Sequence, residues 1–228
     1  MTAPTRFPAG LYGITPQWDD TNQLMQGIEA AIRGGMTALQ WRQKNLDADT
    51  SLRLANAAAE LCRRHGVLFI VNDSIELAQA VQADGIHLGR DDPLPAQARR
   101  QLGPNVLIGC SCYNELDRAR QALQEGADYI AFGAVYPSQV KPQAVRAHLD
   151  ILSQAKTLAR ANAHENRAAI VAIGGITLSN APAVIQAGAD SLAVISGLFQ
   201  TPDIQTAAKA FSALFTTRPS GPDEPPAA

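Results

Sequence analysis

Short apolar runs, rich in β-branched residues, alternate with longer Ala- and Leu-rich segments from one end of the chain to the other. Apolar runs of about four to eight residues are typical of buried parallel strands. Such strands are predicted at Leu11–Thr15, Ala38–Lys44, Leu68–Asp73, Gly85–Gly89, Val106–Ser111, Tyr129–Gly133, Ala169–Gly174 and Ser191–Ser196. Strands interleaved with helices in this way predict an α/β fold, a single-domain (β/α)8 TIM barrel, with a doubly wound sheet as the alternative.

The segments between these runs have the apolar spacing of amphipathic helices. Thr21–Arg33, for example, places Leu24, Ile28 and Ile32 on one helical face. Further helices are predicted at Thr50–His65 (after an N-cap at Asp49 and before a stop at Gly66), Asn114–Glu125 and Leu178–Ala187.

One short pattern recurs where a predicted helix turns into the next strand. It reads Ala83-Asp84-Gly85, Gly126-Ala127-Asp128 and Gly188-Ala189-Asp190. The recurrence supports repeated β/α units, although it is too weak to establish internal duplication. In a barrel these turns lie on the face that serves stability, so we assign them no chemistry.

Composition and charge exclude some classes of binding partner for this protein. The chain has 228 residues, 19 Lys plus Arg against 21 Asp plus Glu, and a net charge of −2. This balance argues against a nucleic-acid or membrane-surface protein. Cys62, Cys110 and Cys112 lack metal-ligand spacing with nearby histidines, so buried reduced thiols are expected.

The two ends of the chain differ from its middle. The N-terminus has neither the charged nor the apolar region of a signal peptide, which predicts a cytoplasmic protein. We expect residues 1–10 to be a lead-in, residues 11–215 to form the barrel, and the Pro-rich residues 216–228 to be a disordered tail. The sequence leaves a homo-oligomer open.

The first candidate for chemistry is the stretch from Gln40 to Lys44. Strand alternation predicts that Gln40, Arg42 and Lys44 share one face, while Trp41 and Gln43 take the other. Two cations and an amide at the end of a strand suit a phosphate or diphosphate ligand. The alternative is an edge strand with ordinary surface charge.

Two carboxylates follow neighbouring predicted strands. Asp73 and Asp92 could share a hard divalent cation such as Mg²⁺, which takes one or two protein carboxylates together with water and phosphate oxygens. The alternatives are an N-cap role for Asp73, which Ser74 could equally serve, and a solvated loop around Asp92.

Glycine-rich turns follow the last two predicted strands, at Gly174-Gly175 and at Ile195-Ser196-Gly197. Loops in these positions of a barrel commonly bind phosphate through backbone N–H groups, so a second phosphate site is predicted at the same mouth. His87 lies in an apolar run and is interpreted as a core residue or a support for the site rather than a catalytic base. No nucleophile and base combination stands out.

Taken together, these stretches resemble the thiamine-phosphate synthase family over roughly Leu11 to Phe215. The matching stretches are Gln40–Lys44, Ile70–Asp73, Asp84–Gly89 with Asp92, Gly109–Ser111, Tyr136–Ser138 with Lys141, Ile173–Ile176 and Ile195-Ser196. The resemblance implies an alkyl transferase of thiamine biosynthesis. It would join a hydroxymethylpyrimidine diphosphate to a thiazole phosphate, or to its carboxylated form, and release pyrophosphate.

The resemblance also implies roles for individual residues. The pyrimidine diphosphate would be held by Gln40, Trp41, Arg42, Gln43, Lys44, Asn72, Ser111 and Lys141, of which Arg42, Lys44, Ser111 and Lys141 would be catalytic. Asp73 and Asp92 would bind Mg²⁺. The thiazole phosphate would be held by Ser138, Gln139, Val140, Gly175, Ile195 and Ser196.

The chain departs from the family pattern at two positions. Ser74 stands where the family often has a second Asp, and Val140 stands where it often has Thr. Two other functions stay open at this point: a barrel like the related thiazole tautomerase, and a phosphate-binding regulatory barrel without activity.

Overall fold

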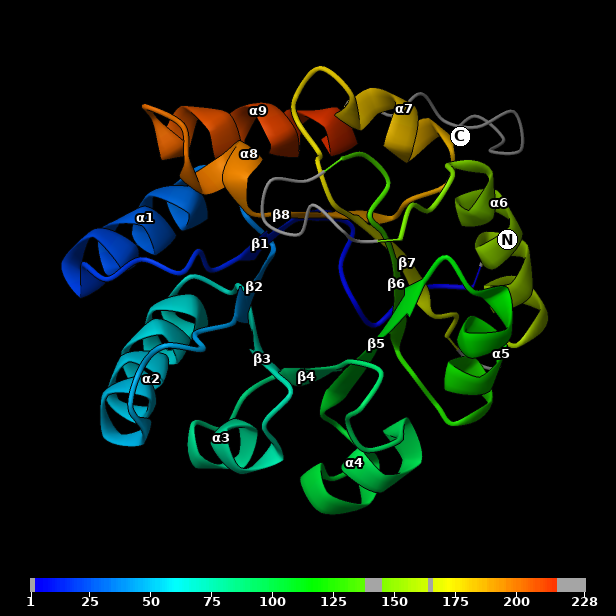
Figure 1. Cartoon of the computed structure of the whole chain (residues 1–228), viewed down its shortest axis with the longest axis horizontal. Coiled ribbons are helices and arrows are strands. Elements are labelled where there is room, and N and C mark those ends of the chain that lie inside the picture. The colour runs from blue at the N-terminus through cyan, green and yellow to red at the C-terminus, as the bar shows by residue number, and fades with distance from the viewer. Residues whose placement is uncertain (1–2, 138–144, 164–165, 217–228) are drawn as a thin grey trace, which may run out of the picture.

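The computed structural model describes residues 3–137, 145–163 and 166–216. Its centre is a closed barrel of parallel strands in sequential order (Figure 1). The strands are β1 (Gly10–Ile14), β2 (Ala38–Trp41), β3 (Leu68–Asn72), β4 (Gly85–Leu88), β5 (Leu107–Tyr113), β6 (Tyr129–Phe132), β7 (Ala169–Ile173) and β8 (Ser191–Val194). β1 closes the ring by pairing with β8, Leu11 lying opposite Leu192. The TIM barrel prediction is therefore confirmed, and the doubly wound sheet is excluded.

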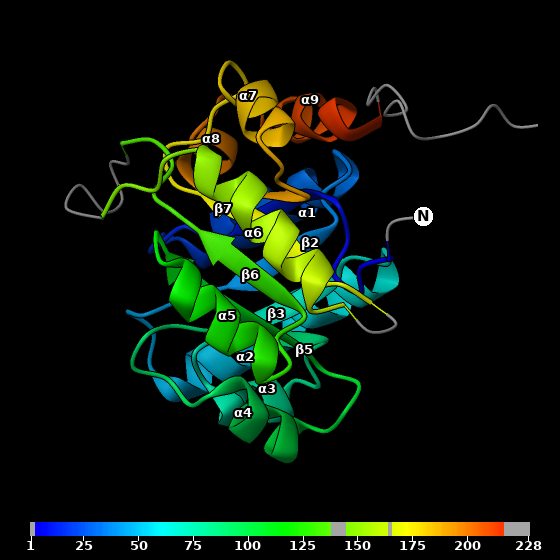
Figure 2. The ribbon, with the colours of Figure 1, turned by 90° about the vertical axis from the view of Figure 1, so that its right-hand side faces the viewer.

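The helices lie outside the ring of strands, as the views along and across the barrel both show (Figures 1 and 2). They are α1 (Thr21–Arg33), α2 (Ala48–Arg64), α3 (Ile75–Ala80), α4 (Pro95–Leu102), α5 (Leu116–Gln124), α6 (Asp150–Ala161), α7 (Ala181–Gln186), α8 (Ser196–Phe199) and α9 (Ile204–Thr216). None of the helices in the described ranges is long and apolar enough to cross a membrane.

Several predicted boundaries were wrong by one to three residues. β2 ends at Trp41 rather than Lys44, because the next amide, of Arg42, donates to the hydroxyl of Thr15 instead of to a strand. α2 begins at Ala48, because Asp47 rather than Asp49 accepts the capping bond, from the amide of Thr50 at 2.9 Å. β8 stops at Val194, two residues before the predicted end.

The other differences are small. β5 runs from Leu107 to Tyr113 rather than over 106–111, α5 covers Leu116–Gln124, and α7 is reduced to Ala181–Gln186.

Two apolar cores hold the barrel together. The larger one fills the space between strands and helices, and the smaller one lies inside the ring. Phe7, which precedes β1, is fully buried in the inner core, with its ring centroid 4.2 Å from that of Tyr129 and 5.1 Å from that of Tyr12. Within the predicted lead-in, Phe7 is thus a part of the barrel interior.

The recurring helix-to-strand junctions share one structural role. Asp84, Asp128 and Asp190 each accept a hydrogen bond from a backbone amide of the preceding strand, at 2.8–2.9 Å. The same contact therefore ties successive β/α units together at the amino ends of the strands. This explains the repeat without any chemistry, as the sequence predicted.

The three cysteines are free and buried. Burial raises the pKa of Cys62 and of Cys110 to about 12 and also raises that of Cys112, so all three thiols are protonated at neutral pH. They have the inert character expected of core thiols.

Candidate active site

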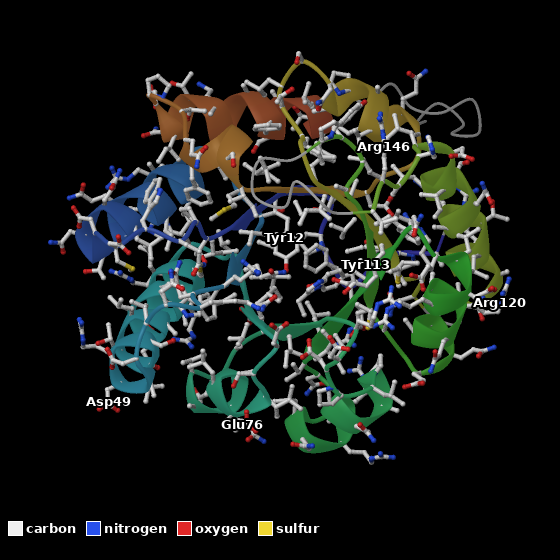
Figure 3. The ribbon with its side chains drawn as sticks, in the orientation of Figure 1. Tyr12, Asp49, Glu76, Tyr113, Arg120 and Arg146 are labelled. Carbon is white, nitrogen blue, oxygen red and sulfur yellow. The ribbon has the colours of Figure 1, made fainter. Side chains whose placement is uncertain are left out.

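The carboxyl ends of the strands surround a hollow of about 880 Å³, including the space open to solvent, which we call the central hollow. Figure 3 shows Tyr12 and Tyr113 within the ring of strands, whereas Asp49, Glu76 and Arg120 lie at the periphery. The polar side chains that line the central hollow include Gln40, Arg42, Asn72, His87 and Ser111. Four of these five were predicted as substrate-binding residues, and the barrel brings them to one mouth.

The loop after β2 is held by the loop after β1. The side chain of Gln17 donates from Nε2 to the carbonyl of Arg42, and its Oε1 accepts from the amide of Lys44 at 2.8 Å. Thr15 Oγ1 accepts from the amide of Arg42 at 2.8 Å. Thr15 and Gln17 therefore set the backbone that carries both cations. Sequence reasoning missed them because nothing in the chain pattern pairs them with residues 42–44.

The residues on either side of Arg42, Trp41 and Gln43, make contacts with the protein itself. Trp41 is 2% exposed and packs in the outer core near Phe69, with ring centroids 6.4 Å apart. Gln43 donates from Nε2 to the carbonyl of Pro16 at 2.7 Å, which braces the same loop. Because β2 ends at Trp41, strand alternation does not extend to Gln43 and Lys44. The structure thus gives Trp41 a packing role and Gln43 a supporting role in the loop, and substrate binding by either residue stays a prediction.

An acidic pair lies beside Lys44. Lys44 Nζ is 3.7 Å from Asp73 Oδ2, and the side chains of Asp73 and Asp92 are within hydrogen-bonding reach of each other. Asp92 Oδ2 also accepts from the amide of Gly89 at 2.6 Å. The N-cap of α3 is Ser74, whose Oγ accepts from the amide of Leu77 at 3.1 Å, so Asp73 has no capping role.

Burial and the neighbouring Asp92 raise the pKa of Asp73, although Lys44 and Asn72 act in the opposite direction. A carboxyl group whose charge is disfavoured by burial and by an adjacent carboxylate is a donor that a hard divalent cation would stabilise. In residues 3–137, 145–163 and 166–216, no group of three or more His, Cys, Asp or Glu could hold a metal ion. A cation on this pair would complete its shell with water and ligand oxygens.

A second hollow adjoins the central one and shares Ile173, Gly174 and Ala193 with it; we call it the glycine hollow. Its wall includes the predicted residues Gly175, Ile195 and Ser196. Gly175 has φ +61°, and a Cβ there would lie 2.3 Å from the carbonyl oxygen of Pro137, so only glycine fits. α8 begins at Ser196, and its first amides have no acceptor within the helix.

Four predicted site residues, Ser138, Gln139, Val140 and Lys141, lie outside the described residues.

His87 is 8% exposed, and its Nε2 is 2.9 Å from Ser111 Oγ. It therefore occupies the supporting position that its apolar neighbours predicted.

A closed barrel with cations, a carboxylate pair and glycine turns at its carboxyl end has the architecture of a TIM-barrel enzyme for phosphorylated small molecules. The family model described as "Thiamine monophosphate synthase" matches residues 11–198. Thiamine-phosphate synthase of Bordetella pertussis is 56% identical over 94% of this chain and 98% of its own length. That of Thiobacillus denitrificans is 48% identical over 93% and 98%.

A solved structure supports the same family. Thiamine phosphate pyrophosphorylase from Pyrococcus furiosus superposes with a TM-score of 0.79 and 31% identity, over 92% of this chain and 97% of that one. The chain belongs to the thiamine monophosphate synthase family, a family of transferases in thiamine biosynthesis.

Proposed function

We propose that this protein joins 4-amino-2-methyl-5-hydroxymethylpyrimidine diphosphate to 4-methyl-5-(2-phosphoethyl)thiazole, yielding thiamine phosphate and pyrophosphate in the cytoplasm. The observation that carries the proposal is the division of one mouth into two joined hollows. The central hollow is lined by Arg42 and adjoins a second group of residues, Lys44 and Asp73, that line a neighbouring hollow together with Arg42 and Asn72. The glycine hollow has glycine turns at a helix start. Two phosphorylated substrates would therefore meet at the boundary between the hollows.

The diphosphate belongs in the central hollow. Arg42 lines it and supplies positive charge, and Lys44 supplies a second cation from the neighbouring hollow that Arg42 and Asn72 also line. Asn72 on β3 and Ser111 on β5 supply neutral donors. Gln40, at the floor, suits the aminopyrimidine ring because an amide can both donate and accept. Lys141 would complete this set from the loop after β6.

Asp73 and Asp92 would hold Mg²⁺. The donor set fits this ion, because carboxylate oxygens are its preferred protein ligands and the two groups lie within hydrogen-bonding reach. When bound, Mg²⁺ would neutralise negative charge on the diphosphate. Lys44, 3.7 Å from Asp73, would contribute to the same neutralisation.

The thiazole phosphate belongs in the glycine hollow. Backbone amides at Gly175 and at the start of α8, with Ile195 and Ser196, offer donors to an anion. Ser138, Gln139 and Val140, which lie outside the described residues, would add further contacts to this substrate. The second phosphate would thus be bound without competing for Arg42 and Lys44.

The chemistry fits a site without a nucleophile. The C–O bond to the diphosphate breaks, pyrophosphate takes the electron pair, and the aminopyrimidine stabilises the resulting benzylic-type cation. The lone pair of the thiazole nitrogen then forms the new C–N bond. Neither step transfers a proton to the protein, so positioning and charge stabilisation suffice.

The test is to incubate both substrates with Mg²⁺ and to measure thiamine phosphate and pyrophosphate together. Equal amounts of the two products would support the proposal. Conversion of the thiazole without pyrophosphate release would favour a tautomerase-like barrel. Binding of both substrates without any product would favour a regulatory barrel.

A further inference from the structure

A chain of buried hydrogen bonds crosses the barrel interior beneath the central hollow. Gln40 Nε2 donates to the hydroxyl of Tyr12 at 2.8 Å, and this hydroxyl lies 2.9 Å from that of Tyr129. The Tyr129 hydroxyl is 3.1 Å from His87 Nδ1, and His87 Nε2 is 2.9 Å from Ser111 Oγ. The chain therefore joins Gln40 on β2 to Ser111 on β5 through side chains of β1, β6 and β4.

The barrel is built to accommodate this chain. Gln40, Tyr12, Tyr129 and His87 are at most 8% exposed. Gly109 leaves the space that Tyr129 needs, because a Cβ at that position would lie 1.8 Å from the Tyr129 ring. Phe7 packs against both tyrosine rings from below. Burial raises the pKa of both tyrosines well above the usual value, so both stay protonated.

The number of protons available to each group gives this chain of hydrogen bonds a direction. The Tyr12 hydroxyl accepts from Gln40, so its single proton is available for Tyr129, and the Tyr129 proton then goes to His87 Nδ1. In the neutral imidazole His87 Nδ1 is then the acceptor, the ring proton lies on Nε2, and Nε2 donates to Ser111 Oγ. The opposite direction would leave the Tyr12 hydroxyl accepting from both neighbours, with its own proton unused by the chain.

We propose that Tyr12, Tyr129 and His87 are positioning residues that hold the Ser111 hydroxyl as a donor and the Gln40 amide oxygen as an acceptor toward the central hollow. This inference rests on the proposed function. A diphosphate only accepts hydrogen bonds, so Ser111 must donate to it. The amino group of the pyrimidine donates, so Gln40 must accept from it. One direction of the hydrogen-bond chain therefore suits both the diphosphate and the amino group of the same substrate.

The orientation can be measured directly in the full-length protein. Two-bond proton–nitrogen NMR spectra of protein with ¹⁵N-labelled histidine report which ring nitrogen carries the proton, and the His87→Gln variant identifies the His87 signals. We expect the Nε2–H form in the wild type and loss of a single fixed form in Tyr129→Phe. A wild-type ring protonated on Nδ1 alone, or a Tyr129→Phe spectrum unchanged from the wild type, would overturn the proposal.

Kinetics test whether the orientation matters. Tyr129→Phe should lower kcat/KM for the pyrimidine diphosphate by about twofold to tenfold, the range for one neutral hydrogen bond, and leave the KM for thiazole phosphate unchanged. In a Ser111→Ala background the same change should cost less than it does in the wild type, because only its effect through Tyr12 and Gln40 remains. Additive losses in the double variant would overturn the proposal.

Two substitutions at one position provide a matched comparison if Tyr129→Phe folds poorly. Gln can place its amide nitrogen near the Nε2 position and still donate to Ser111, whereas Asn reaches only the Nδ1 position. His87→Gln should therefore be more active than His87→Asn, and equal or reversed activities would contradict the proposal. Normal kinetics of Ser111→Ala would instead refute the diphosphate role of Ser111, while the NMR result would still stand on its own.

Discussion

Lys44 Nζ lies 3.7 Å from Asp73 Oδ2, although the two residues belong to loops that follow different strands. The ion pair joins the cationic loop after β2 to the acidic pair formed by Asp73 and Asp92. A diphosphate and a divalent cation would be held by these same groups. The charges at this mouth therefore form one unit, and substitutions in it should affect the two ligands together.

Arg42→Ala should lower kcat/KM for the pyrimidine diphosphate by about tenfold to a hundredfold. Arg42 lines the central hollow, and a lost charge-assisted contact is worth ~1.5–3 kcal/mol. Arg63→Ala is the matched control, because Arg63 lies on the exposed face of α2 beside Glu60. Steady-state kinetics of both variants make the comparison, and normal kinetics for Arg42→Ala would refute the diphosphate assignment.

Asp73→Asn should weaken the response to Mg²⁺ and yet raise the melting temperature at pH 7 in the presence of a chelator. The pKa of Asp73 is raised by burial and by Asp92, so ionising this group disfavours the folded state. Its contribution to stability is fully present below the unfolded pKa and is lost as the pH rises through the folded pKa. The increase in melting temperature caused by Asp73→Asn should therefore become smaller as the pH is lowered toward ~4.

Thermal melts over that pH range, with chelator and with Mg²⁺, measure both effects. Asp49→Asn, an exposed substitution in the first turn of α2, is the control. A melting temperature of Asp73→Asn that still rises with Mg²⁺ as much as the wild type does would speak against Asp73 as a ligand.

Asp190→Ala should destabilise the barrel by ~3–5 kcal/mol without changing the kinetics of the folded enzyme. Asp190 is 3% exposed, and its carboxylate contacts Arg167 at 2.6 Å and Lys156 at 3.2 Å. Burial alone would raise the pKa of Asp190, but Arg167, the amide of Ile170 and Lys156 outweigh it, so the pKa is lowered. The stabilisation is present above the unfolded pKa and is lost as the pH falls through the folded pKa.

Urea unfolding at neutral and acidic pH measures the Asp190 effect. Asp117→Ala is the control, because Asp117 is 95% exposed in its pair with Arg120. Loss of activity at full occupancy of the folded state would show that this face does take part in function.

Gln17→Ala should raise the KM for the pyrimidine diphosphate several-fold, while the KM for thiazole phosphate stays constant. The side chain makes two hydrogen bonds to the backbone at Arg42 and Lys44, each worth ~0.5–1.5 kcal/mol. Gln26→Ala, exposed on α1, is the control. Equal changes in both KM values would mean that Gln17 does not act through this loop alone.

The order of strands and the residues at their carboxyl ends could be predicted from sequence because both follow from apolar periodicity. Asp73 and Asp92 were expected to be neighbours, since sequential strands of a barrel are adjacent. The boundaries of the strands were predicted less accurately. The end of β2, for example, depends on Thr15, a residue far from Arg42 in the chain.

The buried chain from Gln40 to Ser111 could not be predicted in the same way. Tyr12 and Tyr129 look like ordinary strand residues, and their contact spans 117 positions. Only the closed barrel brings their hydroxyls together, and only the missing side chain of Gly109 makes room for the second ring. Phe7 was likewise assigned to a lead-in because nothing local marks it as part of the barrel interior.

The most direct measurement is a crystal structure of the protein with Mg²⁺, pyrophosphate and thiamine phosphate. Our account predicts Mg²⁺ on Asp73 and Asp92, with pyrophosphate against Arg42 and Lys44. It also predicts the phosphate of thiamine phosphate at Gly175 and Ser196. Pyrophosphate in the glycine hollow, or product phosphate on Arg42 and Lys44, would contradict the division of the mouth on which the proposed reaction depends.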